Sequence, residues 1–161
     1  MAKLLKIFKF SAKELLLLVE AWVVFLKWDL LISFTQYEKW RNKIHCLSNL
    51  RKPSLNDAEK SANTAITPEQ ITLIIRLSEI SGRFHFRKMN CLRRCVSQQE
   101  ILVKRSIDTR MHIGIRIEEE KVKAHAWLTL NGRVINDSEE VISLYSELKS
   151  ANEHNALSTL K

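Results

Sequence analysis

Near Ile107 the spacing of apolar residues changes from a helical repeat to a strict alternation, and this change limits the chain to a few fold classes. Before this point, apolar residues recur every three or four positions, as they do on one face of an α-helix. From Met111 to Ile117, apolar and polar residues alternate, as they do in a strand with one buried face. Several helices followed by antiparallel strands predict an α+β fold.

Local signals set the bounds of the expected elements. Thr67 and Gln70 form a capping box, and Pro68 suits the first helical position. A helix is therefore predicted from Pro68 to near Gly82. The other elements are expected, in chain order, as helix with breaks over residues 11–46, a polar loop over 51–65, a helix from residue 91, strands over 111–117, 124–130 and 133–137, and a final helix from residue 138.

The length of 161 residues suits one domain with a helical extension. We expect an N-terminal helical region with its polar loop, residues 1–66, and a core, residues 67–161. The hydrophobic content of 45% and the charged content of 27% exclude a disordered chain. Three cysteines without a secretory pattern favour a cytoplasmic location. The net charge of +8 is compatible with nucleic acid, an anionic membrane surface or an acidic partner.

The run LLLLVEAWVVFL, residues 15–26, is the most apolar part of the chain. It is shorter than the roughly 20 residues that a membrane-spanning helix needs, and Glu20 interrupts it. The run therefore predicts a helix packed in the protein, although peripheral membrane contact is compatible with it. The apolar stripe expected to pack consists of Leu15, Leu18, Val19, Trp22, Val23 and Leu26.

Cys91 is the candidate nucleophile. Asn90 is a good N-cap, so a helix is predicted to start at Cys91 and to hold its thiol in the first turn. The positive end of the helix dipole favours a thiolate there, and unpaired backbone N–H groups could bind an oxyanion. Seven cations between residues 83 and 105, against the single acid Glu100, are expected to add to this effect. Cys95 lies one turn later on the apolar face and is expected to fill the core.

The stretch KAHAWLTLNGRVIND, residues 123–137, predicts a hairpin that carries His125 near one end and Asp137 at the other. A two-residue Asn-Gly turn would pair Leu130 with Arg133 and put Asn136 on the face of His125. A three-residue loop with Gly132 at positive φ would instead put Asp137 directly opposite His125. Either partner could orient the imidazole, and the carboxylate would also stabilise its cation.

Three motifs give the chain its resemblance to a known family. They are Cys-Leu-x-Arg at residues 91–94, His-Ala-Trp at 125–127 and Gly-Arg-x-x-Asn-Asp at 132–137. With the strand RMHIGIR, they resemble the transglutaminase-like cysteine peptidases of lasso-peptide biosynthesis, over roughly residues 80–150. That family removes the leader from a ribosomally made precursor. The resemblance implies a papain-like core, with the cysteine helix packed on a small antiparallel sheet.

The resemblance also implies the catalytic triad Cys91, His125 and Asp137, and it favours the three-residue loop. Residues 1–82 show no strand pattern of a leader-binding domain, so the chain resembles the stand-alone type. The implied partners are a precursor peptide, a separate leader-binding protein and an ATP-dependent macrolactam synthetase. No metal, organic cofactor or nucleic acid is expected. Many family members have a glycine where this chain has Ser106.

Other interpretations remain for the same residues. An amine could replace water as the acceptor, which would give amide transfer instead of hydrolysis. A chain with a degenerate triad could act as a basic adaptor in a peptide-maturation complex or at a membrane. Asp137 could cap the helix that follows it. His112 is a rival base, but the sequence places no acid beside it, so a structural role is expected.

Overall fold

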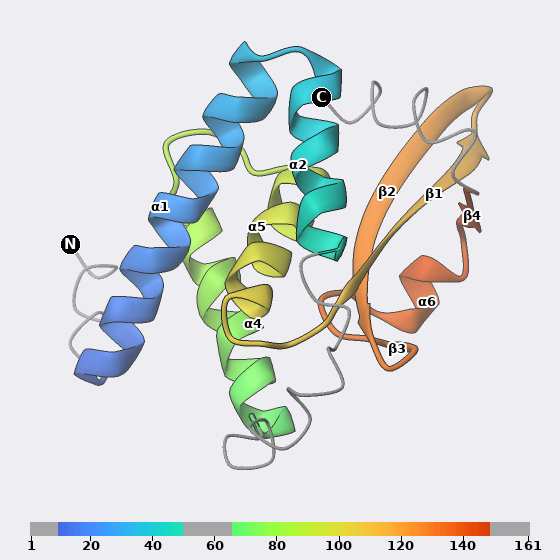
Figure 1. Cartoon of the computed structure of the whole chain (residues 1–161). Helices are drawn as coiled ribbons and strands as arrows, with labels where there is room; N and C mark the ends of the chain where they lie inside the picture. The colour runs from blue at the N-terminus through green and yellow to red at the C-terminus, as the bar shows by residue number, and fades with distance from the viewer. Residues whose placement is uncertain (1–9, 50–65, 149–161) are drawn as a thin grey trace, which may run out of the picture.

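The computed structural model describes residues 10–49 and 66–148, which form an α+β fold (Figure 1). The loop expected over residues 51–65 and the tail after residue 150 lie outside the described residues. In chain order the elements are α1 (Ala12–Phe34), α2 (Tyr37–Asn49), α4 (Pro68–Arg83), α5 (Cys91–Val103), β1 (Arg110–Glu118), β2 (Lys121–Leu130), β3 (Arg133–Val134), α6 (Glu139–Ile142) and β4 (Ser146–Glu147).

The helix α5 lies at the centre of the molecule, between a layer of helices and the sheet (Figure 1). It contacts α1, α2 and α4 on one side and β1 and β2 on the other. Because neighbours surround it, almost every residue from Leu92 to Leu102 is buried. The sheet is antiparallel with the strand order β3-β2-β1-β4. A cysteine helix packed on a small antiparallel sheet is therefore the observed architecture.

The predicted helix start at Pro68 is confirmed, because Thr67 and Gln70 form both hydrogen bonds of the capping box. The start of α5 at Cys91 is also confirmed, with the Asn90 side chain accepting a hydrogen bond from the Arg93 N–H. Ser106, which stands where many members of the family that the chain resembles have glycine, has φ of 68° and so adopts the left-handed conformation. The connection after α5 thus keeps a glycine-like geometry without a glycine.

The apolar stripe predicted for α1 is not the face that packs. The residues that α1 buries are Ala21, Val24, Phe25, Trp28, Asp29 and Ile32. Val19 and Val23, which were expected in the core, are more than half exposed. The sequence misled because α1 is apolar on both faces, so its periodicity has no single preferred direction. None of the described helices is long and apolar enough to cross a membrane.

The predicted three-residue loop is wrong. Leu130 pairs with Arg133, and the turn consists of Asn131 and Gly132, with φ of 51° and 79°. Two residues at positive φ make the tight turn that matches the twist of a hairpin. The predicted positive φ of Gly132 is nevertheless confirmed.

Replacing Gly132 with valine is expected to lower the free energy of unfolding by about 1–2 kcal/mol, because a β-branched residue resists positive φ. A Cβ at this position would meet nothing within 4 Å, so backbone strain and not a clash causes the loss. Urea denaturation followed by circular dichroism measures it. Gly132→Asn is the control, since asparagine tolerates this conformation, and it should recover most of the loss. Equal losses for both variants would contradict the strain argument.

The final helix is much shorter than predicted. Ser138 caps α6, which ends at Ile142, and the chain then returns to pair Ser146 with Ile115 of β1. The Leu148 N–H also donates a hydrogen bond to the Ile113 carbonyl. Pairing with the free edge of β1 satisfies backbone groups that a longer helix would leave without partners at that edge.

Candidate active site

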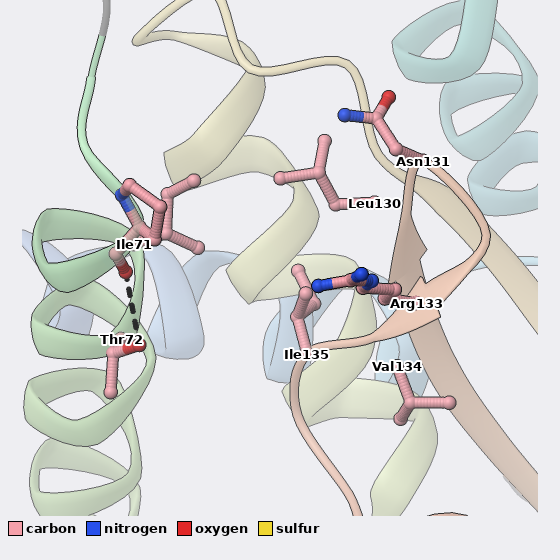
Figure 2. A pocket seen from close by; sticks show the side chains of 8 residues that line it. Ile71, Thr72, Leu130, Asn131, Arg133, Val134 and Ile135 are labelled. Carbon is pink, nitrogen blue, oxygen red and sulfur yellow. Dashed lines mark hydrogen bonds between the residues drawn. The ribbon is translucent and has the colours of Figure 1, made fainter.

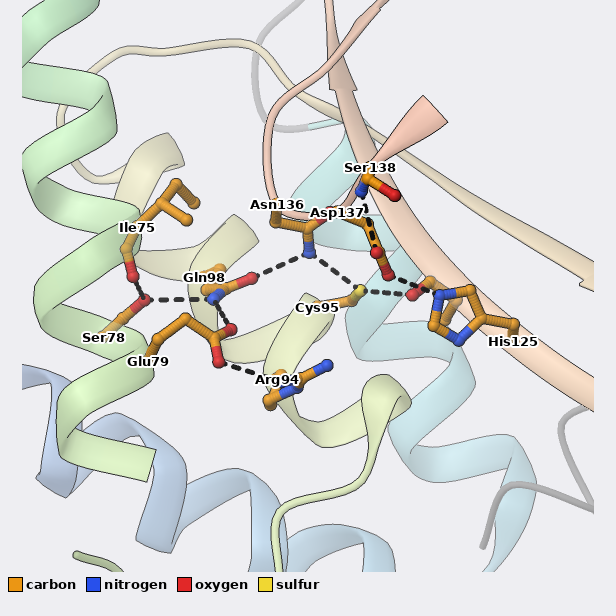
Figure 3. A network of polar contacts seen from close by, with 11 residues as sticks. Ile75, Ser78, Glu79, Arg94, Cys95, Gln98, His125, Asn136, Asp137 and Ser138 are labelled. Carbon is orange, nitrogen blue, oxygen red and sulfur yellow. Dashed lines mark hydrogen bonds and ion pairs between the residues drawn. The ribbon is translucent and has the colours of Figure 1, made fainter. Parts of the chain in front are cut away.

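Cys91 and His125 meet where the N-terminus of α5 reaches β2. Cys91 is half-buried in the first turn of α5, and its thiol is hydrogen-bonded to the His125 imidazole and to the backbone of Ala126. On its other side, His125 Nε2 lies 2.6 Å from Asp137 Oδ2 (Figure 3). The three residues predicted as a triad therefore form one continuous hydrogen-bonded chain.

The hydrogen bond between Cys91 and His125 shifts the pKa values of both groups. Burial raises the pKa of the Cys91 thiol, but the hydrogen bonds to His125 and Ala126 and the positive charge of His125 outweigh it, so this pKa lies below its usual value. The bond to Cys91 raises the pKa of His125, burial opposes it, and Asp137 raises it further. Both shifts favour a thiolate paired with an imidazolium, which is the reactive form of a nucleophilic cysteine.

Asp137 reaches His125 because the chain leaves the sheet after Val134. Ile135 still donates its N–H to the Leu128 carbonyl, but the Leu128 N–H goes to the side chain of Asn136 at 2.8 Å. The residues after this point no longer follow the strand register, so the two-residue turn does not keep Asp137 away. Asp137 does not cap α6, because Ser138 does so. Its second oxygen accepts the Ser138 N–H at 2.8 Å, which fixes the carboxylate.

Asn136 holds the hairpin against α5 and does not contact His125 in the described hydrogen-bond network (Figure 3). Its amide nitrogen donates to Gln98 Oε1 at 2.8 Å and to Cys95 Sγ at 3.2 Å. Cys95 itself is buried and donates to the Ala126 carbonyl at 3.0 Å. Burial raises the pKa of the Cys95 thiol strongly, so Cys95 stays protonated and serves packing.

The seven basic residues near Cys91 were predicted to favour its thiolate, but most of them form ion pairs instead. Five of the seven are paired with acids: Arg87 and Arg93 with Asp29 of α1, Arg94 with Glu79 of α4, Arg105 with Glu20 of α1, and Lys104 with Glu100 of α5 itself. His125, and not these cations, is the charge that lowers the pKa of Cys91. The ion pairs instead fasten α5 to α1 and α4. Apart from Glu100, these acids lie outside residues 83–105, so counting the charges of that segment could not reveal them.

His112 has an acid partner that the sequence reasoning missed. Its Nδ1 lies 2.6 Å from Glu147 Oε1, and its Nε2 lies 2.7 Å from Thr129 Oγ1. Both ring nitrogens of His112 thus have partners, so neither is left to take a proton from a thiol, and the expected structural role of His112 fits these contacts. Glu147 was expected in a helix, and only the return of β4 to the sheet brings it here.

The return of the chain to the sheet also places the ring of Tyr145 5.0 Å from that of His125. Tyr145 is therefore a neighbour of the candidate site that the sequence did not predict.

Two hollows flank these elements. One, of about 590 Å³, lies between the start of α4 and the β2–β3 turn (Figure 2) and contains none of the three candidate triad residues. It is lined by Pro68, Ile71, Thr72, Leu130, Asn131, Arg133, Val134 and Ile135. The other, of about 300 Å³, is formed largely by the basic segment that leads into Cys91, including Arg87, Lys88 and Met89. The segment that lines the second hollow therefore leads directly to Cys91 in the sequence.

Alkylation with iodoacetamide near neutral pH is expected to modify Cys91 at least about tenfold faster than the exposed Cys46, because the His125 contact favours the Cys91 thiolate. Peptide mapping by mass spectrometry after timed quenching gives both rates. His125→Ala is the control, which should slow labelling of Cys91 and leave that of Cys46 unchanged. Equal rates at both cysteines in the unaltered chain would contradict an activated thiol.

A family model described as transglutaminase-like superfamily matches residues 36–150, which is 115 of the 161 residues. The match begins between α1 and α2 and includes Cys91, His125 and Asp137. No curated protein and no solved structure was found that matches the chain. Domains of this kind are typically enzymes that use a cysteine for peptide hydrolysis or acyl transfer, which agrees with the geometry above. On the extent of this match, the chain belongs to the transglutaminase-like superfamily.

Proposed function

We propose that the chain is a cysteine peptidase that removes the leader from a ribosomally made lasso-peptide precursor. The observation that carries the proposal is the hydrogen-bonded chain from the Cys91 thiol through His125 to Asp137, with the pKa of the thiol lowered and that of the imidazole raised. These are the properties that a thiol nucleophile and its acid–base partner need near neutral pH. The three motifs of the lasso-peptide peptidases support the choice of substrate.

In the proposed first step, the Cys91 thiolate attacks the carbonyl carbon of the last leader residue. Backbone N–H groups at the start of α5 donate hydrogen bonds to the oxyanion that forms. His125 gives its proton to the nitrogen of the first core residue, the C–N bond breaks, and the core peptide leaves with a free amine. The leader remains on Cys91 as a thioester.

In the second step, His125 takes a proton from a water molecule, whose oxygen attacks the thioester carbonyl carbon. The C–S bond then breaks, which restores the Cys91 thiolate and releases the leader as a carboxylate. Asp137 holds the imidazole in place and stabilises its charged form through both steps. A reduced thiol is required throughout, so the cytoplasm is the proposed location.

The proposed partners follow from the chemistry and from the stand-alone type of the family. A separate leader-binding protein brings the precursor to the peptidase, which raises the effective concentration of the cleavage site. An ATP-dependent macrolactam synthetase uses the amine that cleavage exposes. The segment that leads into Cys91 lines a basic, polar hollow, and it offers a path for the peptide toward the thiol.

The test is to incubate the full chain with a precursor, with and without its leader-binding protein, and to identify the products by mass. We expect free leader and free core peptide, formed at least about tenfold more slowly without the leader-binding protein. Full-speed cleavage by the chain alone would contradict the stand-alone assignment. An added amine distinguishes amide transfer, because the leader would then gain the mass of the amine in place of water. Unchanged processing by Cys91→Ala would identify an adaptor.

A further inference from the structure

One face of α1 is apolar and exposed, although the opposite face is buried in the core. Five apolar side chains along it have exposed fractions from 45% for Leu30 to 74% for Phe34, the others being Leu16, Val19 and Val23. Their spacing of three, four, seven and four residues places them on one line along the helix. At the rise of an α-helix, this line is about 27 Å long. The protein therefore presents an extended apolar ridge to its surroundings.

The ridge is broadened by the segment that follows α4. Phe86 is 65% exposed, and its ring lies 6.0 Å from that of Trp22 on α1. We call the surface formed by Leu16, Val19, Val23, Leu30, Phe34 and Phe86 the α1 apolar surface. In Figure 1, α1 lies on the side of α5 away from the sheet, so this surface is separate from the hairpin that carries His125. Apolar patches of this extent on a folded protein mark a surface that binds something.

Cations border the α1 apolar surface, and Glu20, the acid that lies between Val19 and Val23 in the sequence, is paired with Arg105. Lys13 is exposed three residues before Leu16, and Lys27, about half-exposed, follows Val23 by one turn. Arg87, next to Phe86, is also about half-exposed. Each of the two buried acids that pair with Lys27 and Arg87 is shared with a second cation, Lys104 for Glu100 and Arg93 for Asp29, so each cluster keeps a net positive charge.

We propose that the α1 apolar surface binds an anionic lipid surface, with α1 lying in the plane of the headgroups. An apolar helix face bordered by lysine and arginine is the combination that binds such a surface. Each cation near an anionic bilayer adds to the binding, and the apolar side chains enter the boundary with the acyl chains. A second copy of the chain is disfavoured as the occupant, because it would bring Lys13, Lys27 and Arg87 of both copies close together. The proposal goes beyond the proposed function and does not depend on it.

The experiment is flotation of the full chain with vesicles of phosphatidylcholine alone and of an equal mixture of phosphatidylcholine and phosphatidylglycerol. We expect the chain to float with the mixed vesicles and not with the neutral ones. Binding should weaken when salt rises from about 0.05 M to about 0.5 M, because screening acts on the cationic border. Absence of flotation with the mixed vesicles, or equal flotation with both kinds, would overturn the proposal.

A matched pair of variants tests the location. Val23→Glu alters a valine that is 54% exposed on α1, whereas Val122→Glu alters a valine that is 53% exposed on β2. The first should reduce binding to mixed vesicles at least about tenfold, since it puts a carboxylate among apolar and anionic groups, and the second by less than about twofold. The rate of Cys91 alkylation should be unchanged in both, which shows that the variants are folded.

Equal binding by the two variants would show that α1 does not carry the membrane contact, and the proposal would be wrong. Analytical ultracentrifugation tests the alternative occupant, a second copy of the chain, because it measures the oligomeric state. A concentration-dependent dimer that Val23→Glu abolishes, in a chain that binds no vesicles, would identify a second copy of the chain on this surface.

Discussion

Replacing Cys91 with alanine is expected to lower kcat/KM for precursor cleavage at least about 10⁴-fold, which is the scale of losing a covalent nucleophile. Replacing Cys95, one helical turn later, is expected to leave cleavage within about threefold of the unaltered chain, because its thiol stays protonated and faces the core. Cys95→Ala instead lowers the free energy of unfolding by about 1–2 kcal/mol through lost packing. Urea denaturation and cleavage assays on the same preparations separate the two effects.

Cys95→Ser serves as the control for the buried position. A serine hydroxyl can donate to the Ala126 carbonyl and accept from Asn136, as the Cys95 thiol does, so less stability should be lost than with alanine. Cys91→Ser keeps the size of the side chain but has no ionisable thiol near neutral pH, so it should remain nearly inactive. If Cys95→Ala abolished cleavage in a folded chain while Cys91→Ala did not, the nucleophile would be misassigned.

The parts of the fold that the sequence predicted well depend on local signals. The caps at Thr67 and Asn90 gave two helix starts because capping is decided within four residues. The alternation in residues 111–117 predicted β1, although Ile113 alone of its alternating apolar residues is fully buried and Ile117 is 78% exposed. The position of Cys91 in the first turn followed from the same cap, and with it the location of the candidate site.

The parts that the sequence could not predict depend on contacts between distant elements. Apolar residues surround α1, so which face it buries is decided by how well it packs on α4 and α5. Asp29, the ion-pair partner of Arg87 and Arg93, comes from α1, which is remote in the sequence. The register argument failed because it assumed that β3 continues to Asp137, whereas β3 has only two residues. The family resemblance suggested the contact between His125 and Asp137, which is present despite the wrong turn.

Replacing Asp137 with asparagine is expected to lower kcat/KM near neutral pH by about 10²-fold or more, and to narrow the pH range of activity. The carboxylate raises the pKa of His125, and charged His125 lowers the pKa of Cys91. Without the carboxylate, the pKa of His125 falls and that of Cys91 rises. The acid limb of the pH profile, set by loss of the thiolate, therefore moves to higher pH, and the alkaline limb, set by loss of the imidazolium, moves to lower pH.

Asn136 provides the matched comparison, because the sequence analysis expected a two-residue turn to place this residue, and not Asp137, on the face of His125. Its side chain holds the Leu128 N–H and Gln98, so Asn136→Ala should lower the free energy of unfolding by about 2–3 kcal/mol. Both limbs of its pH profile should stay where they are in the unaltered chain, since the His125 contact is with Asp137. The measurements are the pH dependence of kcat/KM and of Cys91 alkylation, at a temperature where each variant is folded. Shifted limbs in Asn136→Ala together with unshifted limbs in Asp137→Asn would assign the orienting role to Asn136, against the contact in the structure.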